Sequence, residues 1–241
     1  MFVYAGTMST HHLPARPRNR GAKAPLSRDA VIAAALASLT EDGPEGFTMR
    51  KVAARLETRP SSLYTYVRDQ RELIVLVLDA IAARVSPPTG KGSQRHVVEL
   101  VLAYSRELEA VRGAAQLALV TPPTGPAHLD LLETAMQLLV ASGLSVAKAV
   151  RAGDALFLLT TAAVAERDAR HADPLANSVP ELFDGALDAS AKSRPLLEAG
   201  HEAFRAEDSE RQFAWTLEAF LAGVAAAPAT LPPTRVKRRA R

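Results

Sequence analysis

Apolar residues recur with helical spacing from Ser27 onward. In the first such segment Ile32, Leu36 and Leu39 repeat every three to four residues, which predicts one buried helix face. The Ser27 hydroxyl can cap the amino end of this helix, and the glycines and proline of the segment EDGPEG (41–46) are expected to stop it. No alternating strand pattern, fixed-period repeat or heptad repeat occurs in the sequence. The pattern therefore predicts an all-α protein.

Helical patterns separated by turn residues divide the chain into a head and a body. In the head, a second short helix follows Thr48, a third opens at Pro60 and buries Leu63 and Val67, and a fourth runs from about 70 to 85. The segment SPPTGKG then predicts a boundary. The expected divisions are a basic arm (1–25), a helix-turn-helix head (26–85), a helical ligand-binding and dimerisation body (86–229) and a basic tail (230–241). The body helices are predicted at 93–112, 114–120, 126–142, 145–169 and 209–227, and the looser region 170–207 contains a candidate helix at 182–191.

Composition favours a helical protein and limits the cellular compartment in which it is expected. The hydrophobic content of 48% suffices for a packed core, and alanine and leucine dominate it, which favours helices. No cysteine occurs, so disulfides and thiolate zinc sites are excluded and a reducing compartment suits the chain. The first residues lack the long apolar region of a secretory signal, and this holds whether Met1 or Met8 is the native start. No apolar run in the sequence reaches the length of a membrane span. A cytoplasmic protein without a membrane partner is expected.

Charge is distributed unevenly along the chain. The net charge is +3, yet residues 1–28 and 235–241 each carry five basic residues and no acid, while the remainder carries 19 basic and 26 acidic residues. Basic ends on an acidic body suit contact with a polyanion, since lysine and arginine neutralise phosphates. The alternative is that both ends only keep the chain in solution.

The second and third predicted helices, joined by a tight turn, form a helix-turn-helix pattern. In such a unit the third helix enters the major groove of DNA. With Leu63 and Val67 pointing inward, the pattern places polar side chains on the outer face. These are Ser61, Ser62, Thr65 and Tyr66, with Arg59 at the start of the helix. The same pattern also fits the solvated face of an ordinary three-helix cluster.

Several motifs give a family resemblance. They are Gly-x-x-Gly-Phe-Thr at 43–48, Arg-Lys-Val-Ala at 50–53 and Leu-Tyr-x-x-Val at 63–67, followed by Arg71 and Leu73. With them, residues 26–81 resemble the DNA-binding head of the tetracycline-repressor (TetR) family. A weaker resemblance, over 121–150, is to the core domain of the drug-responsive branch of that family. The resemblance implies a ligand-responsive transcriptional regulator, most simply a repressor, that binds a palindromic operator in double-stranded DNA.

The resemblance also implies residue roles. Thr48 and Arg50 would contact the DNA backbone and a base, and Tyr64 would bind phosphate. The full candidate DNA-binding set is Thr48, Arg50, Arg59, Pro60, Ser61, Ser62, Tyr64, Tyr66 and Gln70. Gln70 stands where the family usually has a phosphate-binding lysine, and Glu57 stands where the turn commonly has glycine. These two departures keep open an alternative, a helical ligand-binding or protein-interaction module without specific DNA binding.

For the body, the resemblance implies a homodimer that pairs helices near 145–169 and 209–227, and a pocket for a small-molecule effector. Ser86 and Ala118 stand where tetracycline-responsive members have metal-binding histidines, so no metal, no cofactor and a largely apolar effector are expected. The candidate pocket residues are Leu119, Met136, Phe157, Thr160, Thr161, Val164 and Glu166, the last matching an acidic residue of the tetracycline site. The same residues could equally be ordinary core.

Enzyme motifs are absent from the sequence. It contains no G-x-S-x-G elbow, P-loop, strand-linked G-x-G-x-x-G or H-E-x-x-H. The six histidines are scattered, mostly in or beside polar segments, and are interpreted as surface residues. The chain is therefore not expected to be an enzyme.

Overall fold

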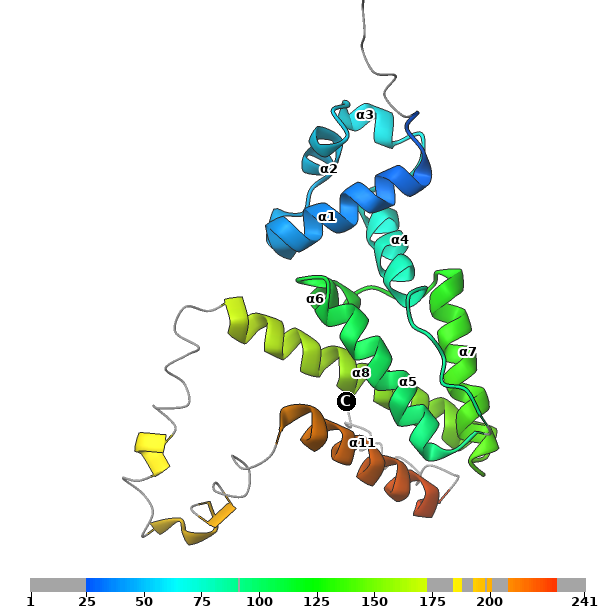
Figure 1. Cartoon of the computed structure of the whole chain (residues 1–241), viewed down its shortest axis with the longest axis vertical. Helices are drawn as coiled ribbons and strands as arrows, with labels where there is room; N and C mark the ends of the chain where they lie inside the picture. Colours follow the sequence, from blue (N-terminus) through cyan, green and yellow to red (C-terminus); the bar gives the residue numbers. More distant parts are fainter. Residues whose placement is uncertain are drawn as a thin grey trace, which may run out of the picture.

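A computed structural model describes residues 25–90, 92–172, 184–187, 193–197, 199–200 and 208–228 of the chain. All regular secondary structure in these ranges is helical, which confirms the predicted fold class (Figure 1). The basic arm up to residue 24 and the basic tail lie outside the described residues, as does most of the candidate helix 182–191, of which 184–187 are helical. The helices are α1 (Arg28–Gly46), α2 (Met49–Arg55), α3 (Pro60–Leu63), α4 (Gln70–Ala82), α5 (Gln94–Glu109), α6 (Ala114–Ala118), α7 (Pro126–Ala141), α8 (Val146–Ala172) and α11 (Ser209–Ala226).

Helix α1 starts and breaks where the sequence predicts. The Ser27 side chain accepts a hydrogen bond from the amide of Ala30 at 3.1 Å, which caps the helix. Gly43 then adopts φ 69° and ψ 178°, a conformation that interrupts the helix and that glycine accommodates without a Cβ clash. The difference from the prediction is that one more helical turn follows, starting at Pro44 and ending at Gly46.

Helix α3 is much shorter than its sequence pattern suggests. It spans four residues, and the chain then continues as turns up to the start of α4. Leu63 and Val67 are both buried, as predicted, and hold this segment against α1 and α2. Because regular helical geometry ends at Leu63, helical spacing no longer decides which side chains beyond it face outward.

Helix α4 joins the head to the body. Its amino end is capped by the Asp69 side chain, which accepts a hydrogen bond from the amide of Glu72 at 2.8 Å. The helix contacts α1 in the head and α5, α6 and α7 in the body. A single hydrophobic cluster runs from Val31 and Leu63 in the head, through Val77 of α4, to Leu131 in the body. Head and body therefore share one core rather than being linked by a solvated hinge.

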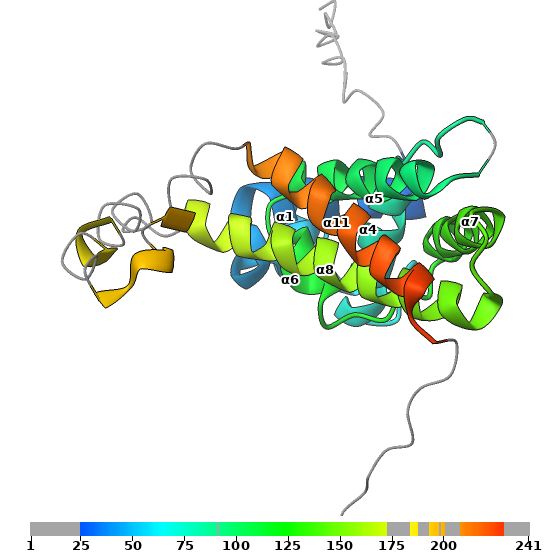
Figure 2. The same ribbon diagram turned by 90° about the horizontal axis from the view of Figure 1, so that it is seen from below.

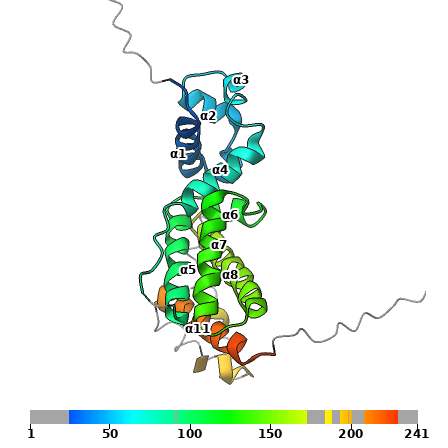
Figure 3. The same ribbon diagram turned by 90° about the vertical axis from the view of Figure 1, so that its right-hand side faces the viewer.

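The body consists of α5, α6, α7 and α8 packed together, with α11 laid across α5 and α8. Figures 2 and 3 show α11 beside α5 and α8 at the end of the molecule far from the head. A second hydrophobic cluster fixes this arrangement, with Val97, Leu139, Leu156 and Leu217 all fully buried. None of the helices in the described ranges is both long and apolar enough to cross a membrane.

Candidate functional site

One face of the head collects most of the predicted DNA-binding residues. We call this face the recognition surface. It is formed by the amino end of α2 and by α3 with the residue after it, which are packed against each other. The Tyr64 side chain is 55% exposed, although its ring is large and apolar. The members of the recognition surface are Thr48, Arg50, Arg59, Pro60, Ser61, Ser62 and Tyr64, all exposed except the half-buried Ser62.

The arginines of the recognition surface are available for binding. Within the described part of the chain, neither Arg50 nor Arg59 forms an ion pair. Other basic side chains of the head are engaged: Arg55 pairs with Glu41 and holds the pKa of that carboxyl below its usual value. Lys51 pairs with Asp42 at 3.1 Å, and Arg28 and Arg68 both lie near Glu72. Free cations are thus found on the face where a phosphate backbone would lie.

Tyr66 does not lie on the outer face as predicted. Its hydroxyl donates a hydrogen bond to the carbonyl of Leu26 at 2.6 Å, and its ring packs against the core. The prediction of an outward Tyr66 is wrong because it extended helical spacing beyond Leu63, where α3 ends. Tyr66 ties the chain before α1 to the turn after α3.

The two departures from the family pattern have local structural explanations. Glu57 adopts φ 49°, the left-handed conformation that glycine normally supplies after a helix, and the amide of Thr58 bonds to the carbonyl of Ala53 at 2.9 Å. The turn therefore keeps its shape despite the glutamate. The Gln70 amide donates to the carbonyl of Phe47 at 2.9 Å, which links the amino end of α4 to the residue before the Thr48 cap.

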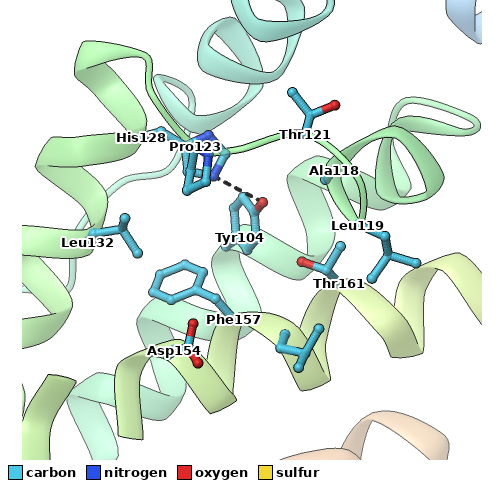
Figure 4. Close-up of a pocket in the computed structure, with 11 residues that line it drawn as sticks. Tyr104, Ala118, Leu119, Thr121, Pro123, His128, Leu132, Asp154, Phe157 and Thr161 are labelled. Carbon is cyan, nitrogen blue, oxygen red and sulfur yellow. Dashed lines mark hydrogen bonds between the residues drawn. The ribbon is translucent and has the colours of Figure 1, made fainter. Parts of the chain in front are cut away.

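A cavity of about 220 Å³ lies in the body between α5, α6, α7 and α8 (Figure 4). Its walls are mostly apolar and aromatic, with a few hydroxyl, imidazole and carboxylate groups. The Tyr104 ring meets the Phe157 ring edge-on, with centroids 5.3 Å apart and planes at 65°. The lining residues are Tyr104, Ala118, Leu119, Thr121, Pro123, His128, Leu132, Asp154, Phe157, Leu158 and Thr161. A concave apolar site with a few convergent polar groups is typical of small-molecule binding.

The polar centre of this cavity is the pair Tyr104 and His128. The Tyr104 hydroxyl and the His128 Nε2 lie 3.2 Å apart, and both residues are buried. Burial raises the pKa of Tyr104 to about 12, an effect that a hydrogen bond with Thr161 partly offsets. Burial also lowers the pKa of His128, and the nearby Asp79 carboxylate opposes this shift. At neutral pH the cavity therefore presents an uncharged phenol and an uncharged imidazole.

Three of the candidate pocket residues, Leu119, Phe157 and Thr161, line this cavity. The other four lie elsewhere. Met136 packs against the second hydrophobic cluster, Val164 is buried in the first, and the Thr160 hydroxyl donates to the carbonyl of Leu156 at 2.8 Å. Glu166 is exposed and pairs with Arg170, one turn further along α8. On α8 the cavity-lining positions are 154, 157, 158 and 161, whereas positions 160 and 164, on the neighbouring side of the helix, are buried in the core.

His128, Tyr104 and Asp154 are among the eight lining residues of the cavity that sequence reasoning missed. The interpretation of His128 as a surface residue is wrong, because it is only 6% exposed. Helical spacing could have found it, since it shares a face with Leu131 and Ala135, both buried. The residue was misjudged because it follows the polar segment TPPTGP.

The cavity is also connected to α4. Helix α7 begins after Gly125, which has no side chain to cap the free amides of the first turn. Instead the Asp79 carboxylate of α4 accepts a hydrogen bond from the amide of His128 at 2.9 Å. A Cβ on Gly125 would lie 2.2 Å from Oδ1 of Asp79, so only glycine permits this close approach. One residue of the cavity wall is thus attached by its backbone to the helix that carries the head.

Together these features define a class of protein. A helix-turn-helix head with free basic side chains is joined by one helix to an all-α body that contains an apolar cavity with a few convergent polar groups. This is the organisation of a one-component transcriptional regulator, in which one chain contains both the DNA-binding and the ligand-binding module.

Comparisons with known proteins identify the family. Residues 86–227 match the model of the tetracyclin repressor-like C-terminal domain. The chain is 30% identical over 175 residues to the class E tetracycline repressor protein of Escherichia coli, covering 70% of this chain and 82% of that protein. It is 32% identical over 164 residues to an HTH-type transcriptional regulator of Saccharopolyspora erythraea, covering 66% and 69% of the two chains. The chain belongs to the TetR family of transcriptional regulators, whose members are not enzymes.

Solved structures show the same relationship. The TetR family protein ActR of Streptomyces coelicolor, in complex with (S)-DNPA, has a TM-score of 0.73 and 30% sequence identity to this chain. The match covers 84% of this chain and 98% of that one. The same protein in complex with actinorhodin has a TM-score of 0.72. The similarity extends over head and body together.

Proposed function

We propose that the chain is a homodimeric repressor that binds a near-palindromic operator and releases it when a small, largely apolar effector occupies the cavity. The observation that carries this proposal is the position of α4. It contacts α1 in the head and also caps the helix that bears His128 in the cavity wall. A ligand that rearranges the cavity wall would therefore act on the helix that positions the recognition surface, and ligand and operator would be coupled reciprocally.

The composition of the recognition surface supports operator binding. Arg50 and Arg59 offer free charges for phosphates or guanine edges, and the Tyr64 hydroxyl is exposed at the end of α3. Small side chains at Ser61 and Ser62 would let the backbone of α3 approach the groove closely. Residues Thr48, Arg50, Arg59, Pro60, Ser61, Ser62 and Tyr64 remain the proposed DNA contacts, whereas the Tyr66 hydroxyl and the Gln70 side-chain amide are engaged within the head.

The outer faces of α8 and α11 support a homodimer. Both helices expose large apolar side chains that a monomer would leave in water: Val150 is 53% exposed, Leu159 41% and Trp215 68%. The two helices are in contact along one side of the body (Figure 2). Pairing them with a second copy would cover these side chains, and a two-fold dimer would present two recognition surfaces to half-sites about 34–36 Å apart.

The cavity supports an effector that is mainly apolar. Relatives of this chain include tetracycline repressors, and ActR has been solved in complex with actinorhodin. By analogy we propose a ring-containing effector that packs against Phe157 and Leu132 and hydrogen-bonds to the Tyr104–His128 pair. No group of three or more potential metal-ligating side chains occurs in the described ranges, so we propose binding without a metal.

The test is a gel-shift titration with DNA from upstream of the gene that encodes the protein. Arg50→Ala and Tyr64→Phe are each expected to weaken operator binding by about 1–3 kcal/mol. Arg95→Ala, which changes an exposed residue of α5 in the body, is the control and should bind normally. Binding should also weaken steeply with salt, by about one log–log unit for each phosphate contact. Normal binding by both head variants would exclude this face as the DNA-binding site.

The alternative function, a helical ligand-binding module without specific DNA binding, makes a different prediction. It expects ligand binding in the body but no operator complex at any salt concentration. The glycine-like conformation of Glu57 and the engaged Gln70 side chain favour the repressor, because both keep the head in a defined shape.

A further inference from the structure

The cavity contains one formal charge, and that charge is negative. Of its eleven lining residues only Asp154 is an acid, and none is a lysine or an arginine. Asp154 is exposed at the edge of the cavity, beside Phe157 in Figure 4. Among the described residues it has no ion-pair or hydrogen-bond partner in the chain. Its charge is therefore available to a ligand.

The remaining polar groups of the cavity cannot compensate an anion. Tyr104 and His128 are buried and uncharged at neutral pH, since burial raises the pKa of the phenol and lowers that of the imidazole. The other polar groups are the hydroxyls of Thr121 and Thr161. An anionic ligand would lose its hydration, gain no cationic partner and face the carboxylate of Asp154.

The aromatic walls favour the opposite charge. Phe157 lies one turn beyond Asp154 on α8, and its ring meets the Tyr104 ring edge-on at a centroid distance of 5.3 Å. Aromatic faces attract cations, and the attraction adds to that of a nearby carboxylate. A flat ring system can therefore lie against these rings while a protonated nitrogen on its edge reaches the mouth of the cavity.

We propose that the effector is a cationic aromatic compound, whose ring system packs against Phe157 and Tyr104 and whose protonated nitrogen lies beside Asp154. The cavity volume of about 220 Å³ is small for a ligand site, because such sites typically span roughly 300–1,000 Å³, and it suits a compact molecule of a few fused rings. This inference rests on the proposed role of the cavity as the effector site, and it adds the charge that selects the ligand.

The experiment uses three fluorescent probes with the same ring system and different charge: 9-aminoacridinium, neutral acridine and acridine-9-carboxylate. Their binding to the full-length protein is measured by fluorescence titration without DNA. The wild-type protein should bind the cation most tightly and the carboxylate most weakly. Asp154→Asn should weaken binding of the cation about three- to fivefold, the range expected for a partly exposed ion pair, and leave acridine unchanged. The loss should shrink as salt is raised, because an exposed charge pair is screened.

The control variant is Glu166→Gln, which removes an acid from the same helix at a position outside the cavity. It should not alter the order of the three probes. Phe157→Ala should weaken all three probes by a similar factor, which would place them in the cavity. Equal or tighter binding of the carboxylate by wild type, an unchanged cation affinity in Asp154→Asn, or no binding of any probe would overturn the proposal.

This experiment separates the ligand preference from the proposed repressor function, because it involves no DNA. A charge preference that depends on Asp154 supports the inference even if the protein binds no operator. An operator complex in the gel-shift titration, together with a preference for the anionic probe, supports the repressor function and overturns the inference.

Discussion

Asp79 provides the sharpest test of how the head is attached to the body. Its carboxylate, on α4, accepts a hydrogen bond from the amide of His128 at 2.9 Å and so caps α7 from a different helix. Gly125 has no side chain that could replace this cap. We predict that Asp79→Ala destabilises the protein and that Asp79→Asn, which keeps an acceptor oxygen but loses the charge, has a smaller effect.

The loss of stability can be estimated from the interactions that Asp79→Ala removes. The alanine variant leaves the amide of a residue only 6% exposed without its partner, which costs about 1–3 kcal/mol. It also removes a negative charge from the positive end of a 16-residue helix, worth about 0.3–1 kcal/mol. Because the two terms overlap, we expect a loss of about 1.5–3 kcal/mol for Asp79→Ala and about 0.5–1 kcal/mol for Asp79→Asn.

The assay is urea denaturation followed by helical circular dichroism, at one fixed protein concentration because the proposed dimerisation would contribute to stability. In thermal unfolding, a 2 kcal/mol loss corresponds to a decrease in Tm of about 4–8 °C for a chain of this length. Asp130→Ala, an exposed acid in the first half of α7, is the control and should remain within about 0.5 kcal/mol of wild type. If Asp79→Ala is as stable as this control, the cap does not stabilise α7 and the proposed link between cavity and head loses its basis.

Three further predictions concern other parts of the molecule. Trp215 is the single tryptophan of the chain and is 68% exposed in one copy, so its emission should shift to shorter wavelength as a dimer forms on raising protein concentration. Emission that does not change between monomer and dimer fractions separated by size would remove Trp215 from the interface. Burial lowers the pKa of His128 below 6.5, so the unfolded chain binds more protons and the free energy of unfolding should decrease as pH falls below about 6.5. His128→Gln should reduce this slope by up to about 1.4 kcal/mol per pH unit in urea titrations between pH 5.5 and 6.5. Equal slopes in the variant and the wild-type protein would contradict the lowered pKa of His128. Finally, Glu57→Gly should raise the free energy of unfolding by up to about 1 kcal/mol, because φ 49° strains a residue with a Cβ; a decrease would mean that contacts of the glutamate side chain outweigh that strain.

Helical spacing and turn residues were sufficient to predict the helices themselves. The predicted segment 126–142 is observed as Pro126–Ala141, and 145–169 as Val146–Ala172. Prolines, glycines and capping hydroxyls determine these ends locally, so they can be inferred without knowledge of the tertiary structure. Tyr66 shows the limit of such reasoning. Its outward placement assumed that α3 continues, whereas the turn after Leu63 and the carbonyl of Leu26, forty residues earlier, decide where its ring lies.

The cavity was harder to predict because its residues come from helices far apart in the sequence. Tyr104 and His128 belong to α5 and α7, and each looks like an ordinary member of an amphipathic helix. Only their packing brings the hydroxyl and the imidazole within 3.2 Å. Spacing also could not distinguish Thr161, which lines the cavity, from the adjacent Thr160, which bonds to its own helix.

The length of α4 determines how strongly a small movement in the body is felt at the DNA. Its 13 residues make a rod about 20 Å long, since an α-helix rises about 1.5 Å per residue. If the rod pivots at Asp79 by about fifteen degrees, its far end, nine residues away and held to Phe47 by Gln70, moves by about 3.5 Å. That displacement is close to the roughly 3.4 Å spacing of successive base pairs. A modest tilt of α4 can thus shift the head by a full step along the groove.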